Sequence, residues 1–443
     1  MILFYTEIGK QEEHKIFFMK AQTKVQFFFR WAGLASLIPL TILCLITCTH
    51  RTSNTLVLWT DRPEFAIYAQ YFNAVQEQYR VEVRFFDSPA QRLIDEEEHP
   101  DIVIASWLNS ASVRSHFRRL DNVFRRDGLS RSSFYPRLLA IGSFDRRQLL
   151  IPVSYNIPAM VFARDFTQNP SNPFTIEMEE IKERSRAFNT VTNGVFDRMG
   201  FSPSSSDDFL FIAATLFGVS FREAAPLAWE SRALENSIAW VQNWITEANT
   251  SIQTEDDFAY KYFFDPPDRL VNSGRILFTY MDSARFFTLS EERRANLDFR
   301  WLAVGERIPL DEWTVFYGIH RRTRATRAAE AFTKWFFTAE TQRLLLEESK
   351  RKRISDTSFG IAGGFSAMQT VTEQVFPLFY PDLLGRMPPE SFLSPPNVLP
   401  QNWMTIKERV ILPYLRDRIR HSSRDEVRSL ERRMGDWHRL NRG

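Results

Sequence analysis

The side chains best suited to bind a ligand follow two apolar segments of strand length. Trp59-Thr60-Asp61 closes the segment that begins at Thr55, and Ser106-Trp107-Leu108-Asn109 follows the segment Pro100–Ala105. In sheets with parallel strands, ligands bind beyond the carboxyl ends of the strands. An indole face can cover the C–H groups of a ring, and a carboxylate or amide can bond its hydroxyl groups. The two segment ends therefore predict a ligand-binding site.

The elements around these ends follow the order of a parallel α/β sheet. After the strand Thr55–Trp59, apolar residues at helical spacing predict a helix over Phe65–Tyr79, with Asp61 and Pro63 as start signals. Val81–Phe85 alternates like a second strand, and the segment at Pro100–Ala105 is typical of a buried one. Strand, helix, strand, helix, strand predicts a parallel sheet.

An uncharged segment, Trp31–Thr47, precedes these elements, and three basic residues, Lys20, Lys24 and Arg30, lie just before it. A basic start, a short apolar run and a small-residue exit are typical of a secretory signal sequence. Met19 is an alternative start that would leave a compact basic region. The signal predicts that the rest of the chain is exported.

The end of this segment, Leu45-Ile46-Thr47-Cys48, resembles a bacterial lipobox, although Thr47 stands where Gly, Ala or Ser is usual. We expect residues 1–47 to be removed, Cys48 to be lipidated, and residues 48–54 to form a tether. The alternative is an uncleaved anchor helix, because the apolar run is at the short edge of what spans a bilayer. Both readings place the later residues outside the cytoplasm.

The composition excludes several classes of function. A net charge of +2 over 443 residues gives no general attraction to nucleic acid. The two cysteines, Cys44 and Cys48, both lie at the signal, so no thiol remains for a disulfide or a thiolate metal site. The seven histidines show no ligand spacing, and motifs of common hydrolases and nucleotide-binding enzymes are missing. We therefore expect no metal, no cofactor and no enzyme activity.

Residues from Thr55 to Phe124 resemble the first lobe of extracellular solute-binding proteins of ABC importers, in the maltose-binding-protein-like sugar family. That family opens with a strand ending in Trp, then an amphipathic helix, a Pro-Asp-Ile strand and a segment ending in Leu-Asp. The corresponding residues here are Leu56–Trp59, Phe65–Tyr79, Pro100–Trp107 and Leu120-Asp121. Gln148–Asn156 resembles the family's crossing strand after Ile-Pro.

Later segments extend the resemblance to roughly residues 55–420. Ala159–Phe166, Pro173–Met178 and Leu270–Met281 resemble consecutive family elements, the last a helix-to-strand unit around Gly274. Trp313–Ile319 would be the return strand, and Arg327–Leu346 resembles a late helix. The resemblance implies a periplasmic-binding-protein-like α/β fold, with two lobes joined by crossover strands near Pro152-Val153 and Phe316-Tyr317 and a ligand cleft between them. It divides the chain into lobe 1 (54–152 and 318–352) and lobe 2 (153–317 and 353–443).

The resemblance and the strand ends together give a set of expected ligand-binding residues. The aromatic members are Trp59, Trp107, Tyr155, Tyr280, Trp313 and Trp403. The polar members are Asp61, Asn109, Asn156, Asp282 and Arg285. For each aromatic residue, packing in the core is the alternative, because the chain is rich in Phe, Tyr and Trp.

The resemblance implies a lipid-anchored substrate-binding protein on the periplasmic side of the membrane. It would be a monomer that binds a sugar or oligosaccharide by hinge closure and delivers it to permease subunits. Three alternatives remain open, and one of them is an extracytoplasmic hydrolase, which would turn over an oligosaccharide. The ligand could be another solute, since a polyamine would need carboxylates around the aromatics and an anion would need Arg and helix N-termini. The chain could also act as a surface adhesin or interaction module.

The C-terminal segment carries nine arginines from Arg416 onward and an apolar stripe, Val427, Leu430, Met434 and Trp437. This spacing predicts a terminal helix that packs on lobe 2. The alternative is a basic amphipathic helix at the membrane surface.

Overall fold

The computed structural model describes residues 54–441 apart from 96, 126–127, 167–169 and 422–425. The signal segment and the expected lipidation site at Cys48 lie outside the described residues. Thr52–Gly443 forms one compact unit. Within it, one lobe is built on a six-stranded sheet and the other on a four-stranded sheet.

The sheet of lobe 1 is parallel at one side and antiparallel at the other. Its strands in spatial order are β2 (Arg80–Phe85), β1 (Thr55–Thr60), β3 (Ile102–Ser106), β14 (Val315–Ile319), β6 (Ile151–Tyr155) and β15 (Phe365–Ser366). β1 is parallel to β2 and β3, as the sequence predicts, and β14 runs antiparallel to β3 and β6. The carboxyl ends of β1 and β3 therefore meet at one edge.

The helices of lobe 1 cover both faces of its sheet. They are α2 (Phe65–Val75), α3 (Pro89–Asp95), α4 (Ala111–Arg114), α5 (Pro136–Ala140), α13 (Thr326–Phe336) and α14 (Ala339–Arg351). Short 3-10 turns lie at Asp121–Phe124, Arg131–Ser133 and Ile354–Asp356, and a hairpin joins β4 (Ser143–Phe144) to β5 (Arg147–Gln148). Apolar residues that alternate along β1, such as Leu56 and Leu58, are fully buried in the core.

Two helices of lobe 1 are shorter than the sequence predicts. The first ends at Val75 instead of Tyr79, because Gln76 leaves the helix and its side chain bonds the backbone of Tyr79. The expected late helix is split into α13 and α14. Thr338 begins α14 by accepting a 3.2 Å hydrogen bond from Thr341 N, which satisfies a free backbone donor at the new N-terminus.

The sheet of lobe 2 contains β11 (Phe278–Asp282), β7 (Pro158–Ala163), β12 (Leu297–Ala303) and β8 (Thr175–Glu177), in that order. The helices of this lobe are α6 (Met178–Phe188), α7 (Asp207–Leu216), α8 (Ser231–Asn249), α9 (Ile252–Lys261), α10 (Pro267–Asn272), α11 (Ser283–Phe287) and α12 (Glu291–Arg294). A 3-10 turn (Pro203–Ser205) precedes α7, and β9 (Thr190–Thr192) pairs with β10 (Val195–Arg198). Between α10 and β11, Gly274 has φ +64°, and a Cβ there would lie 2.8 Å from the Phe166 ring.

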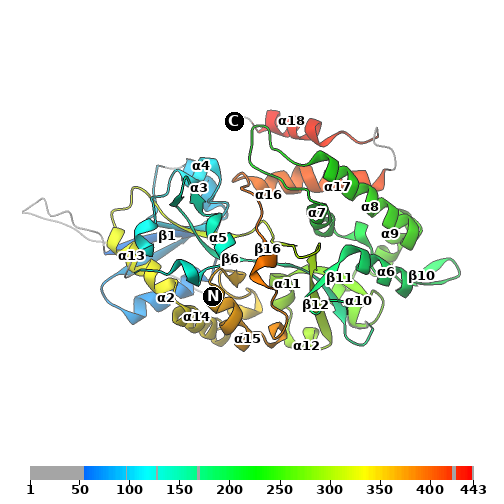
Figure 1. Ribbon diagram of the computed structural model, residues 1–443, viewed down its shortest axis with the longest axis horizontal. Coiled ribbons are helices and arrows are strands. Elements are labelled where there is room, and N and C mark those ends of the chain that lie inside the picture. Colours follow the sequence, from blue (N-terminus) through cyan, green and yellow to red (C-terminus); the bar gives the residue numbers. More distant parts are fainter. Residues whose placement is uncertain (1–53, 96, 126–127, 167–169, 422–425, 442–443) are drawn as a thin grey trace, which may run out of the picture. The chain divides into compact units, whose positions relative to one another are not determined.

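The C-terminal segment packs on lobe 2. It forms α16 (Trp403–Ile406), a π-helical turn (Lys407–Ile411), α17 (Leu412–Arg420) and α18 (Leu430–Leu440). In Figure 1 these helices, in orange to red, run over α7 and α8. Val427, Leu430 and Met434 are buried in the lobe 2 core, and Trp437 packs against it. The apolar stripe therefore packs on lobe 2, as the first of the two expectations predicts.

Three segments connect the two lobes. The first passes directly from β6, which ends at Tyr155, to β7, which begins at Pro158. The second runs from β13 (Ile308–Pro309) to β14. The third leaves β15 through a π-helical turn (Val371–Val375), α15 (Phe376–Phe379), two 3-10 turns (Pro381–Leu383, Glu390–Phe392) and β16 (Leu393–Ser394), which pairs with β13. The residue ranges expected for the lobes stay a prediction.

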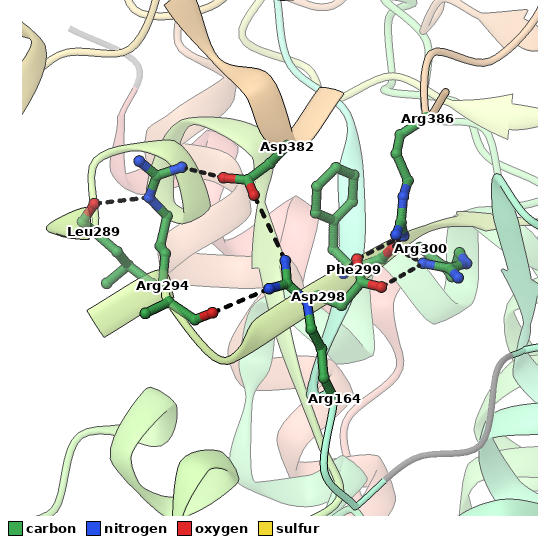
Figure 2. Close-up of polar contacts among 9 residues, drawn as sticks. Arg164, Leu289, Arg294, Asp298, Phe299, Arg300, Asp382 and Arg386 are labelled. Carbon is green, nitrogen blue, oxygen red and sulfur yellow. Dashed lines mark hydrogen bonds and ion pairs between the residues drawn. The ribbon is translucent and has the colours of Figure 1, made fainter. Parts of the chain in front are cut away.

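The third connection is held to lobe 2 by ion pairs of two aspartates with three arginines, which Figure 2 shows together with Arg300 of lobe 2. Asp382 pairs with Arg294 at 2.7 Å and with Arg164 at 3.7 Å. Asp298 of β12 pairs with Arg386 of the connection at 2.6 Å and with Arg300 of its own strand at 3.2 Å. Trp301 Nε1 also donates a 2.7 Å hydrogen bond to the carbonyl of Arg386. These contacts fix the segment around residues 382–386 to the lobe 2 sheet.

Candidate ligand-binding site

The carboxyl ends of β1 and β3 form a shared polar corner. Arg62 follows β1, and its Nη2 donates a 2.9 Å hydrogen bond to Ser106 Oγ at the end of β3. Arg62 Nε also lies 3.1 Å from Asp61 Oδ1. The corner exists because the two strands are parallel neighbours, so the residues that follow them emerge on the same edge.

Two tryptophans lie beside this corner. The ring centroids of Trp107 and Trp313 are 4.7 Å apart, with the rings tilted by 53°. Ser106 Oγ donates a 3.3 Å hydrogen bond to the carbonyl of Trp313, which connects the end of β3 to the second connection. Trp107 has φ +57°, a left-handed conformation that is rare for a bulky residue. Such backbone strain is concentrated at functional sites.

The side chain of Asn156 joins the first connection to the loop before β15 and to the first turn of α11. Its Nδ2 donates a 2.9 Å hydrogen bond to the carbonyl of Gly363, and its Oδ1 accepts a 2.7 Å bond from Ser283 Oγ. Ser283 Oγ in turn accepts a 3.1 Å bond from Ile157 N. Both ends of the Asn156 amide are therefore occupied by the protein, which makes this side chain a link in the hinge region.

The lobe 2 side of the site is acidic. Asp282 ends β11 and caps α11, because its Oδ1 accepts a 2.7 Å hydrogen bond from Arg285 N. Asp311, on the second connection, accepts a 3.0 Å bond from Trp313 N. The next residue, Glu312, forms an ion pair with Lys407. The charges of these carboxylates act on the half-buried Tyr280 of β11.

The surroundings of these groups disfavour negative charge. Burial, with the charges of Asp282 and Glu312, raises the pKa of Asp311 to about 8. Burial also raises the pKa of Asp61 and of Asp282 above their usual range. The pKa of Tyr280 is raised by burial and then by the neighbouring carboxylates. Asp311 therefore keeps its proton at neutral pH, and Asp61 and Asp282 ionise less readily than exposed aspartates.

We call this set of connected residues the interlobe cluster. It consists of Asp61, Arg62, Ser106, Trp107, Asn156, Tyr280, Asp282, Asp311, Glu312 and Trp313. It takes residues from both sheets and from two of the three connections. Chemically, it offers aromatic faces beside carboxylates, which suits reversible binding of a polar ring.

Six of the expected ligand-binding residues belong to the cluster, and the other five lie elsewhere. Trp59, Tyr155 and Trp403 are fully or almost fully buried in hydrophobic cores, against Phe86, Phe365 and Phe221 among others. Asn109 is buried in the loop after β3, and Arg285 is exposed on α11. The ligand contacts of all eleven residues stay predictions.

Four residues of the cluster were not among those expected, namely Arg62, Ser106, Asp311 and Glu312. The sequence carried a signal for most of them, because Arg62 follows Asp61, Ser106 precedes Trp107, and Asp311-Glu312 immediately precedes Trp313. Lys407 had no local signal, since it reaches Glu312 from a distant helical turn.

The sequence matches no family model and no curated protein. Solved structures do match over most of the chain. An ABC substrate-binding protein from Listeria monocytogenes in complex with cycloalternan is 11% identical, with a TM-score of 0.58 over 87% of this chain and 97% of that one. The cyclic α-maltosyl-1,6-maltose binding protein of Arthrobacter globiformis is 13% identical, with a TM-score of 0.58 over 86% and 96%.

The maltose/maltodextrin-binding domain MalE from Bdellovibrio bacteriovorus, bound to maltotriose, is 12% identical, with a TM-score of 0.54 over 88% of this chain and all of that one. The chain has the two-lobed fold of the ABC substrate-binding proteins. This confirms the α/β periplasmic-binding-protein fold expected from the sequence. The matched proteins are binding proteins rather than enzymes.

Two further observations concern the described residues only. They contain no group of three His, Cys, Asp or Glu side chains arranged to hold a metal ion. No helix among them is long and apolar enough to cross a bilayer.

Proposed function

We propose that the chain is the substrate-binding component of an ABC importer and that it binds a sugar or oligosaccharide at the interlobe cluster. The observation that carries the proposal is the pair formed by Trp107 and Trp313 beside a polar corner, in a substrate-binding-protein fold. Indole faces cover sugar rings, and the polar groups bond hydroxyls. Because the cluster draws on both lobes, a ligand that contacts both would favour their closure.

The proposal extends to the membrane. A lipid on Cys48 would hold the protein on the outer side of the cytoplasmic membrane, where permease subunits accept the ligand. Metabolic labelling with palmitate should mark the full chain and not Cys48→Ser. An unlabelled wild-type chain would contradict lipid anchoring and favour the uncleaved helix.

Ligand binding can be tested on the full chain in detergent by thermal unfolding with maltotriose, mannotriose and shorter sugars. A ligand at 100 times its dissociation constant stabilises the folded state by about 2.7 kcal/mol. Trp107→Ala and Trp313→Ala should abolish the shift. Trp437→Ala is the matched control, because this half-buried indole packs on lobe 2 through α18. It should lower the unfolding temperature and keep the ligand shift. A shift that survives both cluster variants would refute the proposed site.

A further inference from the structure

The lobe 1 sheet carries a group of basic side chains at the end that lies opposite the interlobe cluster. There β14 ends at Ile319, which pairs with Ile102, the first residue of β3. Two further segments pair beside this end, since Arg118 N donates a 2.9 Å hydrogen bond to Ile319 O and Arg321 N donates a 2.8 Å bond to His116 O. We call this group the basic edge, and it consists of His99, His116, Arg118, Arg119, His320, Arg321, Arg322 and Arg324.

The five arginines of the basic edge have no ion-pair partner among the described residues. The side chains of Arg119, Arg321 and Arg324 are exposed and form no hydrogen bond within the described part of the chain. Their charge reaches the histidines, because burial and then the charge of Arg321 lower the pKa of His116. The basic edge therefore carries positive charge that its own groups do not pair.

The described acids nearest to His99 in the sequence oppose only part of this charge. Asp101 Oδ2 accepts a 2.9 Å hydrogen bond from Val57 N, and its Oδ1 accepts the hydroxyl of Thr323. Glu98 forms its ion pair with an arginine of β2. Asp101 and the exposed Glu97 thus oppose two of the five positive charges, and three remain.

The rings of His99 and His320 show that the basic edge also has more hydrogen-bond donors than acceptors. The two rings stack with their centroids 4.7 Å apart. Arg322 donates from its backbone N–H to His320 Nδ1 at 3.2 Å and from its Nη1 to His99 Nε2 at 2.6 Å. Both histidines therefore carry their hydrogen on the other nitrogen. Those nitrogens, His320 Nε2 and His99 Nδ1, are buried without a partner among the described residues, so the edge lacks acceptors, which an oxyanion supplies.

The basic edge lies beside the point where the chain arrives from its proposed membrane attachment. Asp101 N donates a 2.8 Å hydrogen bond to Val57 O of β1, and His320 N donates a 2.9 Å bond to Asp101 O. Thr55 begins β1 two residues before Val57. Cys48 precedes Thr55 by seven residues, which span at most about 25 Å when fully extended. Whether Cys48 is lipidated or the apolar segment before it stays as an anchor, this length keeps the basic edge near the bilayer surface.

We infer that the basic edge binds the phosphate groups of anionic phospholipids, so that this end of lobe 1 lies on the membrane surface. Guanidinium groups bond phosphate oxygens through paired N–H donors. Each arginine near an anionic surface strengthens binding about fivefold, and a short tether keeps the edge at a high local concentration of lipid. The inference goes beyond sugar binding and rests on the proposed membrane attachment. Because the interlobe cluster lies at the other end of the same strands, lipid contact leaves it uncovered.

The test is hydrogen–deuterium exchange of the full chain reconstituted into vesicles, read by mass spectrometry. One preparation contains equal parts of phosphatidylcholine and phosphatidylglycerol, a second contains phosphatidylcholine alone, and a third adds inorganic phosphate to the neutral vesicles. We expect exchange in residues 114–124 and 317–326 to slow about fivefold or more in the anionic vesicles relative to the neutral ones. Residues 190–195, which are exposed in the β9–β10 hairpin of lobe 2, should exchange equally in all three.

Charge removal on each lobe separates the basic edge from a general effect of charge. The first triple variant is Arg119→Gln, Arg321→Gln and Arg324→Gln. It removes no hydrogen bond of the described chain and should abolish the slowing. The matched control removes three exposed arginines of lobe 2 that also lack ion pairs among the described residues, Arg232→Gln, Arg269→Gln and Arg409→Gln. It should keep the slowing. Potassium chloride at about 1 M, where the screening length is about 3 Å, should remove the slowing while the chain stays attached.

The outcomes separate the inference from the membrane attachment on which it rests. Vesicle flotation shows whether the full chain is attached, and a chain that does not float would overturn both. An attached chain that exchanges equally in anionic and neutral vesicles would overturn the inference alone. Slowing that persists in the first triple variant, or that is lost in the control, would overturn the assigned arginines. Slowing by inorganic phosphate over neutral vesicles would assign the edge to a soluble oxyanion and overturn the lipid as its source.

Discussion

Ser283 Oγ donates a 2.7 Å hydrogen bond to Asn156 Oδ1 and so ties the first turn of α11 in lobe 2 to the first connection between the sheets. The same hydroxyl oxygen accepts the N–H of Ile157. Asn156 then bonds the carbonyl of Gly363 in the loop that leads to β15 of lobe 1. One buried hydroxyl and one amide thus join three segments that are far apart in the sequence.

We predict that Ser283→Ala lowers stability by about 1–3 kcal/mol, because it leaves a buried backbone donor and a buried amide oxygen without their partner. Urea unfolding of the full chain, followed by far-ultraviolet circular dichroism, measures the change. Ser273→Ala is the matched control, since that exposed hydroxyl bonds only a carbonyl of its own turn. Equal midpoints for the two variants would contradict the hinge role of Ser283.

A second prediction concerns Asp311 and pH. Its pKa is raised by burial from 3.8 to about 8 in the folded chain, so the folded state keeps a proton that the unfolded state releases. Stability from this group is complete below about pH 4 and is lost as the pH rises to about 8. Asp311→Asn should therefore match wild type near pH 4 and exceed it near pH 9 in urea midpoint. A constant difference across this range would show that Asp311 ionises normally.

His320 should act in the opposite pH range. Burial lowers its pKa from 6.5 to about 4, and the charges of His99 and His116 contribute. Between about pH 6.5 and pH 4, His320 is protonated in the unfolded chain and neutral in the folded chain. Stability should therefore fall as the pH drops through this range. His320→Asn can keep the bond that His320 Nδ1 accepts from Arg322 N and should flatten this part of the profile. The check is the urea midpoint against pH, and parallel profiles would be the contrary result.

The anchoring of the third connection gives a further prediction. Asp298→Ala leaves Arg300, only 5% exposed at its side chain, without its ion-pair partner, and frees Arg386. Removing one partner of a buried pair costs about 3–5 kcal/mol. Asp382→Ala is the comparison, because Asp382 is about a third exposed and its loss should cost less. Urea unfolding ranks the two variants, and an equal or reversed order would contradict the expectation.

Much of the fold could be predicted from local patterns. The runs at Thr55–Trp59 and Pro100–Ala105 became parallel neighbours, since short apolar runs around an amphipathic helix have few other arrangements. The helix ends were less accurate, because single side chains decide them. Gln76 ends α2 and Thr338 begins α14, each through one or two hydrogen bonds of its side chain.

The site was predictable only where residues follow a strand. Trp107 lies just beyond β3 and reaches the cluster, whereas Trp59 lies inside β1 and faces the core of lobe 1. Tyr155 and Asn156 are adjacent in the sequence. Tyr155 packs among aromatic rings, whereas Asn156 bonds Gly363 and so links two segments of the hinge region. Side-chain direction depends on where the strand stops, and sequence alone does not fix that residue. Lys407 could not be found, because only the tertiary fold brings it to Glu312.

The closeness of Trp107 and Trp313 has a practical consequence. Indoles whose centres are 4.7 Å apart share their electronic excitations, so the pair should give a coupled signal in the near-ultraviolet circular dichroism spectrum. The largest buried indoles, Trp59, Trp244, Trp301 and Trp403, are enclosed in cores and would form a steady background. Because Trp107 directly follows a strand of one sheet and Trp313 lies on a connection to the other, any movement of that connection would alter the coupling. The protein thus carries an unlabelled optical sensor of the state of its proposed binding site.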